Sequence, residues 1–152
     1  MDFQTDRVTE TSEVGEIVEA PTLSGGRLTP ARQTVLQILK GTNLALTHHE
    51  IEHQAREKGV QFDRVTLYRA LEWLVTKDLA HKVAAEDRVW RFSAARDGSR
   101  DQAYFHCTNC GAVYCLEVAP LQQPAVVPEG FKAHRTEIML RGECAQPTCT
   151  RA

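Results

Sequence analysis

The 152-residue sequence lacks any apolar run that approaches the roughly 20 residues of a membrane span. Its first residues also lack a basic segment followed by an apolar stretch, so we expect no secretory signal and a reducing, cytoplasmic setting. An HExxH motif and a Ser/His/Asp grouping are missing as well. We therefore expect no membrane partner, no small-molecule substrate and no enzymatic activity, with a metal-dependent enzyme or thiol oxidoreductase as the alternative from another class.

Net charge is also small, only −2, which taken alone argues against a nucleic-acid partner. The distribution of the charges points the other way. Residues 1–26 contain six acidic side chains against one basic side chain and almost no aromatic residues, which predicts a disordered acidic tail. The rest of the chain has 17 basic against 14 acidic residues. The body of the protein is thus mildly basic.

Cysteines are few but closely grouped, and four of the five form two pairs. Cys107 and Cys110 have CxxC spacing and precede Gly111, and Cys144 and Cys149 begin 34 positions later. Two such pairs predict a tetrahedral structural Zn2+ site, because each tight turn presents two sulfurs. The alternatives are two disulfides, a redox-active CxxC and four buried thiols. The missing export signal argues against the first, and the absence of a thioredoxin-like βαβ pattern argues against the second.

Three helices are predicted before residue 80, each beginning at a capping residue. A Thr-Pro pair at 29–30 begins the first helix, which Gly41 ends. The Thr-His-His-Glu sequence at 47–50 is a capping box for a second helix that runs to Gly59, and its histidines (His48, His49 and His53) are interpreted as solvent-facing. Asp63 begins the third helix. Its buried face comprises Leu67, Ala70, Leu71 and Leu74.

Two short strands, residues 81–84 and 88–92, are predicted after the third helix. Three helices and a hairpin is the order of a winged helix-turn-helix domain, in which the third helix enters the major groove. The alternative is a helical bundle with a hairpin, in which the same polar residues are solvated. The candidate DNA-binding residues can contact phosphates, base edges or a thymine methyl group; they are Arg32, Arg64, Thr66, Tyr68, Arg69, Lys82 and Arg88, with Arg91 also on the predicted wing.

The second half is rich in predicted strands. Residues 93–103 are small and polar and predict a hinge between a DNA-binding domain, residues 27–92, and a second domain, residues 104–152. In the second domain we expect strands at 104–107 and 112–116 and a long strand at 131–141 whose buried face holds Ile138 and Leu140. The segment 119–128 contains three prolines and is too broken for a full helix. Because so small a sheet buries little apolar surface, zinc and dimerisation would have to stabilise it.

Over about residues 27–149 the order of these motifs resembles the ferric uptake regulator family. The matching segments are 28–32, 62–71 with its Thr-x-Tyr-Arg core, 79–83 and the two cysteine pairs. The resemblance implies an α+β fold, with an N-terminal winged helix-turn-helix domain followed by a small α/β dimerisation domain with a four-cysteine zinc site. It also implies a cytoplasmic bacterial repressor that binds palindromic double-stranded DNA as a homodimer, and in which a second metal between the domains favours the DNA-binding form.

Several residues resemble the sensing site of zinc uptake regulators within that family. His81 matches a wing histidine ligand, and Cys115 stands where those proteins have an acidic ligand. A thiolate favours zinc, so the regulatory divalent metal is expected to be Zn2+. The candidate sensing ligands are His81, Cys115, Asp101, His106 and His134. The alternative is a regulator that keeps the structural zinc alone and responds to a redox or other signal, or binds DNA constitutively; Cys115 is then a buried strand thiol and His81 an exposed wing histidine.

Overall fold

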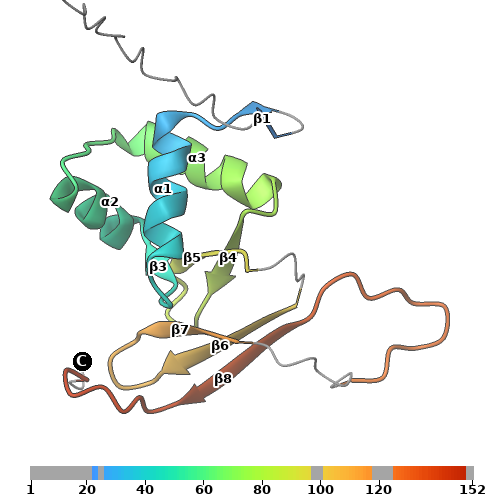
Figure 1. Ribbon diagram of the computed structural model, residues 1–152. Helices are drawn as coiled ribbons and strands as arrows, with labels where there is room; N and C mark the ends of the chain where they lie inside the picture. The colour runs from blue at the N-terminus through green and yellow to red at the C-terminus, as the bar shows by residue number, and fades with distance from the viewer. Residues whose placement is uncertain (1–21, 24–25, 97–100, 118–124, 150–152) are drawn as a thin grey trace, which may run out of the picture.

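The three helices come before most of the strands, which form antiparallel and mixed sheets, so the predicted α+β class is confirmed. The computed structural model describes residues 22–23, 26–96, 101–117 and 125–149; nearly all of the predicted acidic tail and most of the segment 119–128 lie outside them. Helices α1 (Pro30–Lys40), α2 (His48–Glu57) and α3 (Arg64–Thr76) form one layer above two three-stranded sheets (Figure 1). In this part of the chain no helix is long and apolar enough to span a bilayer.

The three helices begin where their capping residues predict. The Thr29 hydroxyl accepts a hydrogen bond from the Arg32 backbone N–H, and Pro30 occupies the first helical position. Thr47 and Glu50 form the expected reciprocal capping box. Helix α2 ends at Glu57, slightly earlier than predicted. The helices pack around a core that includes Val35, Ile51, Leu67, Leu71 and Leu74.

A short hairpin of β1 (Thr22–Leu23) and β2 (Gly26–Arg27) precedes α1 in the chain. Gly26 adopts a φ of 142°, and a Cβ atom there would come within 3.1 Å of the Trp73 indole nitrogen on α3. Glycine at this position therefore lets the backbone pass close to the Trp73 indole.

The sheet that contains the predicted wing, called the wing sheet below, has the strand order β3-β5-β4, from β3 (Leu46–Thr47), β4 (Ala80–Ala84) and β5 (Trp90–Ala94). The predicted second wing strand, residues 88–92, is therefore wrong by two positions. Arg88 has a φ of 59°, and the Asp87 carboxylate accepts a hydrogen bond from the Val89 backbone N–H. Both features place residues 88 and 89 in the turn rather than in the strand.

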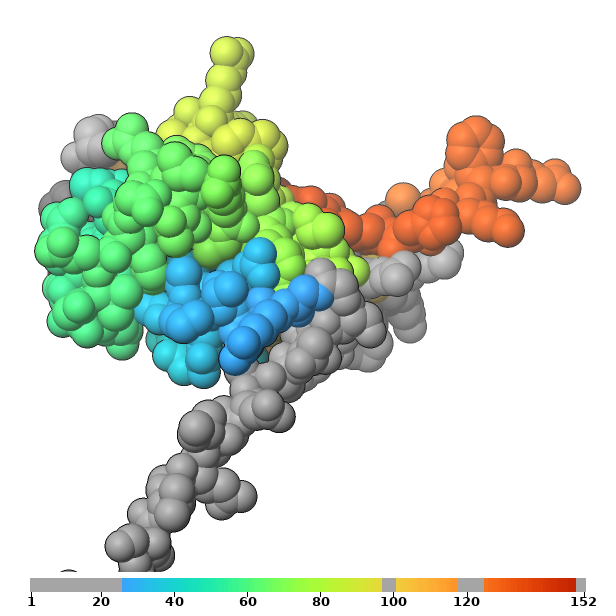
Figure 2. All heavy atoms as spheres, turned by 90° about the horizontal axis from the view of Figure 1, so that it is seen from above, coloured from blue at the N-terminus to red at the C-terminus, as the bar shows by residue number. Residues whose placement is uncertain are grey.

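The second sheet has the order β7-β6-β8, from β6 (Gln102–Cys107), β7 (Val113–Leu116) and β8 (Glu137–Gly142). Strand β7 is antiparallel to β6, and β8 is parallel to it. The predicted strand 131–141 is wrong over its first half. Since β6 begins at Gln102, whose register partner is Glu137, earlier residues extend beyond the sheet. Residues 125–131 are exposed and project from the body in both views (Figures 1 and 2).

The buried face of β8 is the opposite of the predicted one. Met139 packs against a small core of Ala45, Val83, Tyr104 and Val113, whereas Leu140 is 51% exposed. This core lies between the wing and the second sheet, so the face of β8 that points to the wing is the one that is covered. Strands β5 and β6 extend into the predicted hinge from both sides.

The loop after α1 joins the two parts of the molecule directly. The Ala45 backbone N–H donates to the Val113 carbonyl at 2.8 Å, and the Cys115 N–H donates to the Asn43 carbonyl at 2.6 Å. Backbone bonds of this kind fix the position of β7 against the helical layer.

Candidate metal centre and nucleic-acid interface

The topology of the second sheet brings the two cysteine pairs to one end of it. Cys107 is the last residue of β6, and its register partner in the parallel strand β8 is Gly142. Cys144 therefore follows β8 at the same end where Cys110 follows β6. Gly111 has a φ of 75° and donates its backbone N–H to the Cys107 carbonyl at 2.9 Å, which closes the turn.

The four sulfurs form a group of the size that zinc requires. All lie within 4.8 Å of one another, with 3.6 Å between the Cys107 and Cys149 sulfurs and 3.8 Å between those of Cys110 and Cys144. A tetrahedral site with metal–sulfur bonds of about 2.3 Å has sulfur–sulfur edges of about 3.8 Å. The donors are soft, and their spacing fits one Zn2+ ion; when bound, the ion would hold both turns together.

Local hydrogen bonds already favour thiolates at two of the positions. Hydrogen bonds from the backbone N–H of Cys110, and then from that of Cys144, lower the pKa of the Cys107 thiol to about 6. The backbone N–H of Gln146 lowers the pKa of Cys144. The neighbouring Cys144 sulfur raises the pKa of Cys149. These hydrogen bonds thus favour negative charge at Cys107 and Cys144, which a divalent cation would neutralise.

Arg91 connects the cysteine turn to the wing. Sequence reasoning placed it on the DNA-facing wing, but it is 8% exposed and points inward. Its guanidinium donates two hydrogen bonds to Asp87, one to the Val89 carbonyl at 3.3 Å and one to the Gly111 carbonyl at 3.2 Å. The wing hairpin and the metal centre are therefore held in one arrangement.

His81, the first candidate sensing ligand, is buried on β4 with 5% exposure. The Arg135 guanidinium lies 3.2 Å from its Nδ1, across the boundary between the wing and the second sheet. Burial lowers the pKa of His81, and Arg135 lowers it further. Its buried Nε2 has no hydrogen-bond partner among the described residues.

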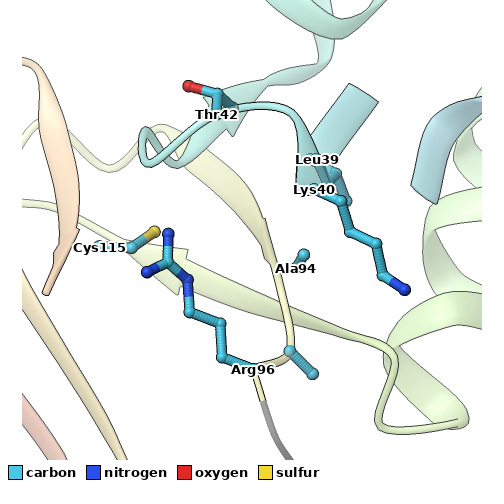
Figure 3. Close-up of a pocket in the computed structure, with 7 residues that line it drawn as sticks. Leu39, Lys40, Thr42, Ala94, Arg96 and Cys115 are labelled. Carbon is cyan, nitrogen blue, oxygen red and sulfur yellow. The ribbon is translucent and has the colours of Figure 1, made fainter. Parts of the chain in front are cut away.

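Cys115, on β7, also faces an arginine. It lines a small cavity with Leu39, Lys40, Thr42, Ala94, Ala95 and Arg96, and its sulfur points toward the Arg96 guanidinium (Figure 3). Burial raises the pKa of the Cys115 thiol, which a hydrogen bond with Ser93 and the charge of Arg96 partly offset. The cavity therefore presents a neutral thiol and cationic side chains.

The other candidate sensing ligands lie apart. The Asp101 carboxylate accepts a hydrogen bond from the Thr136 backbone N–H at 3.1 Å. His106 is buried on β6, and His134 is exposed. Within residues 22–23, 26–96, 101–117 and 125–149, the four cysteines are the one group of three or more potential ligands that come within metal-binding reach of each other. The structure does not bring the five candidate sensing residues together.

Helix α3 presents a polar outer face above its buried one. Arg64, Tyr68 and Arg69 are exposed, and Tyr68 retains 41% of its surface. Thr66 is half-buried, and both its backbone N–H and its hydroxyl donate to the Asp63 carboxylate. The candidate DNA-contacting residues of this helix therefore lie on its first two turns, which the Asp63 cap orders.

The candidate basic residues outside α3 stack on aromatic rings or lie at the wing tip. Arg32 lies over the Trp73 ring at 4.2 Å and donates to the Arg27 carbonyl. Lys82 lies over the Trp90 ring at 4.2 Å, and Arg88 is exposed in the wing turn. Cation–π contacts order the long side chains without removing their charge from the surface.

Two residues of this surface escaped the sequence reasoning. His48 was expected to face solvent, but its ring lies between Tyr68 and Phe92, with centroid distances of 4.1 and 4.9 Å. Trp90 is 48% exposed on the wing. For Trp90 the available sequence signal was a tryptophan two positions after Arg88, close to the wing turn. For His48 the local sequence held no such signal.

Comparison with known proteins gives a consistent result. A family model described as the ferric uptake regulator family matches residues 23–141. The zinc uptake regulation protein of Escherichia coli K12 is 30% identical over 122 residues, which cover 78% of this chain and 71% of that protein. The ferric uptake regulation protein of Bacillus subtilis 168 is 29% identical over 129 residues, which cover 80% of this chain and 85% of that protein.

One solved structure similar to this chain is described as a zinc uptake regulator complexed with zinc and DNA. It has a TM-score of 0.58 and 28% sequence identity, and the match covers 80% of this chain and 83% of that one.

Proposed function

Since the chain belongs to the ferric uptake regulator family, a family of regulators and not of enzymes, we propose that it is a metal-dependent transcriptional repressor that binds DNA. In this proposal it acts in the cytoplasm as a homodimer on palindromic operators, and Cys107, Cys110, Cys144 and Cys149 hold a structural Zn2+. The observation that supports it most directly is the four-sulfur cluster, whose 3.6 and 3.8 Å edges suit zinc, in a chain similar to a regulator solved with zinc and DNA.

Helix α3 is the proposed DNA-reading element. Its exposed first turns carry Arg64, Tyr68 and Arg69, and the wing adds Lys82 and Arg88. In a symmetric dimer two such helices would enter successive major grooves roughly 34 Å apart. Binding should weaken steeply with salt because the phosphate contacts release counterions.

The outer face of the second sheet is the proposed dimer interface. Phe105, Ile138 and Leu140 lie on the side of the sheet opposite to Met139, in the register of β6 and β8. They are partly or largely exposed in the single chain. An apolar sheet face of this kind is stabilised when a second copy covers it.

Zinc content and DNA binding, measured on the same samples, test the proposal. We expect at least one Zn2+ per chain that mild chelation leaves in place, and retardation of palindromic DNA at low salt. Replacing Cys110 by Ser should remove that zinc and abolish DNA binding. A zinc-loaded dimer that retards no palindromic DNA would contradict the function.

A second candidate is a regulator of this fold that keeps the four-cysteine zinc alone. It is favoured by one observation, namely that His81 and Cys115 each face an arginine rather than another ligand. Equal DNA affinity with and without a second zinc equivalent would support it. Loss of DNA affinity on removal of a second, weakly held zinc would instead support a zinc sensor that uses candidate ligands among His81, Cys115, Asp101, His106 and His134.

A further inference from the structure

The contact between His81 and Arg135 bridges the two parts of the molecule. His81 belongs to β4 of the wing, and Arg135 lies just before β8 of the second sheet. Their side chains meet at 3.2 Å although they are 54 positions apart in the chain. We propose that Arg135 takes the place of a regulatory metal ion and holds the wing against the second sheet when no second metal is bound.

The hydrogen-bond chemistry assigns the roles of the two ring nitrogens. A guanidinium group has donors and no acceptor, so Nδ1 of His81 must accept, and the ring proton must be on Nε2. The one lone pair that the neutral ring could offer a metal is therefore used by Arg135. A metal ion could bind His81 at Nδ1 only by displacing the guanidinium.

Two of the other candidate ligands also have partners within the protein. The Arg96 guanidinium lies beside Cys115 in the cavity, and the Asp101 carboxylate accepts from the Thr136 backbone next to Arg135. Arg135 beside His81 and Arg96 beside Cys115 would each oppose the binding of a divalent cation, whereas the charge of Asp78, which also acts on His81, would favour it. An arginine supplies positive charge and directed donors there, which is what a bridging cation would otherwise supply.

The location of the His81–Arg135 contact gives it a regulatory role, and this role rests on the proposed function. Strand β4 follows α3 directly, so the hold on β4 also sets the orientation of the DNA-reading helix relative to the second sheet. If the sheet carries the dimer contacts, the His81–Arg135 contact contributes to the spacing of two α3 helices, together with the Arg91–Gly111 bond. The protein would then adopt its DNA-binding form without a second metal ion.

Hydrogen exchange of the β4 amides in the full-length, zinc-loaded protein tests the inference without DNA. We expect R135A to speed exchange in β4 about three- to tenfold, because a hydrogen bond from a charged donor is lost at a site that water can reach. R135K should restore part of the protection. K132A, which removes an exposed cation from the same segment, should leave the exchange unchanged.

A spectroscopic readout separates this role from general stabilisation. The 15N signals of the His81 side chain should show the proton on Nε2 in the wild type and in K132A, and a mixture of the two tautomers in R135A. Combining R135A with H81Q should add little to the exchange rate of either single variant. Unchanged β4 exchange in R135A overturns the inference, as does a second zinc equivalent that the wild type binds and H81Q does not.

DNA binding by the same proteins distinguishes the inference from the function on which it rests. With the four-cysteine zinc retained, R135A should bind palindromic DNA about three- to tenfold more weakly than K132A. If R135A opens the wing and none of the proteins binds DNA, the proposed function fails while the role of Arg135 in closing the molecule is supported.

Discussion

Arg91 joins the wing to the cysteine turn through a single buried guanidinium group. Its hydrogen bonds to Asp87 measure 2.9 and 2.6 Å, and they hold the pKa of that carboxyl at about 2, against an ordinary value of 3.8. Asp87 therefore stays charged throughout the mildly acid range. The pair keeps Arg91 in place to donate to the Gly111 carbonyl.

Replacing Asp87 by Asn should lower the free energy of unfolding by about 1 kcal/mol, after allowing for solvent around the partly exposed carboxylate. The lowered pKa means that this contribution is fully present above pH 3.8 and is lost as the pH falls toward 2. Urea unfolding should thus give the same loss at pH 7 and pH 5. E86Q is the matched control, because the Glu86–Arg141 pair is exposed and should contribute less than about 0.5 kcal/mol.

His48 should stabilise the fold more in its neutral form than in its protonated form. Burial lowers its pKa below 6.5, and the charge of Lys82 lowers it further. The unfolded chain therefore binds a proton more readily than the folded one, and stability should fall as the pH decreases below 6.5. H48F keeps the ring stack on Tyr68 and should lose stability less steeply between pH 7.5 and pH 5.5 in urea unfolding. The same slope in both proteins would show that His48 does not titrate in this way.

At the scale of elements, the capping residues are the features that the sequence specifies best. Thr29, Thr47 and Asp63 each bond to a backbone N–H within their own first turn, so the signal is local and readable. Strand boundaries depend on partners far away in the chain. The start of β8 is set by where β6 begins, and the start of β5 by the positive φ of Arg88. Neither is encoded in the hydrophobic pattern nearby.

The candidate site shows the same difference between features set by local sequence and features set by distant residues. The two cysteine pairs, each closely spaced in the sequence, predicted the four-sulfur cluster, and the structure contains it. The surroundings of His81 depend on Arg135, 54 positions away, and no spacing rule connects the two. Long-range side-chain contacts of this kind decide whether a ligand is free to bind metal.

The Asp63 cap should matter for DNA binding more than the other caps do, because it orders the turn that holds Arg64 and Thr66. D63A should weaken DNA binding about fivefold, by fraying that turn, whereas D63N retains an accepting oxygen and should bind normally. T47A removes the corresponding cap from α2 at a cost of about 1 kcal/mol and serves as the control. Fluorescence anisotropy with a labelled duplex measures the three affinities. Equal weakening in D63A and T47A would assign the effect to overall stability.

On the scale of the whole molecule, the apolar outer face of the second sheet should decide the oligomeric state. Placing a carboxylate on it with L140D should raise the dimer dissociation constant by about tenfold or more, because a leucine would be lost from a covered surface. V126D changes an apolar residue that is 96% exposed on the projecting segment and should leave the dimer intact. Sedimentation equilibrium distinguishes the two outcomes. A dimer of unchanged strength in L140D would place the interface elsewhere.

If the four cysteines bind zinc as proposed, the parallel pairing of β6 and β8 should make metal loading all-or-none. One cysteine pair precedes the long connection between β7 and β8 and the other follows it, so a zinc ion gains its full set of four bonds only after that connection has closed and β8 has docked. A partly supplied population should therefore contain complete and empty molecules rather than half-filled ones. Zinc availability would then set how many competent repressors a cell contains, through the yield of folding itself and independently of any change in their affinity for DNA.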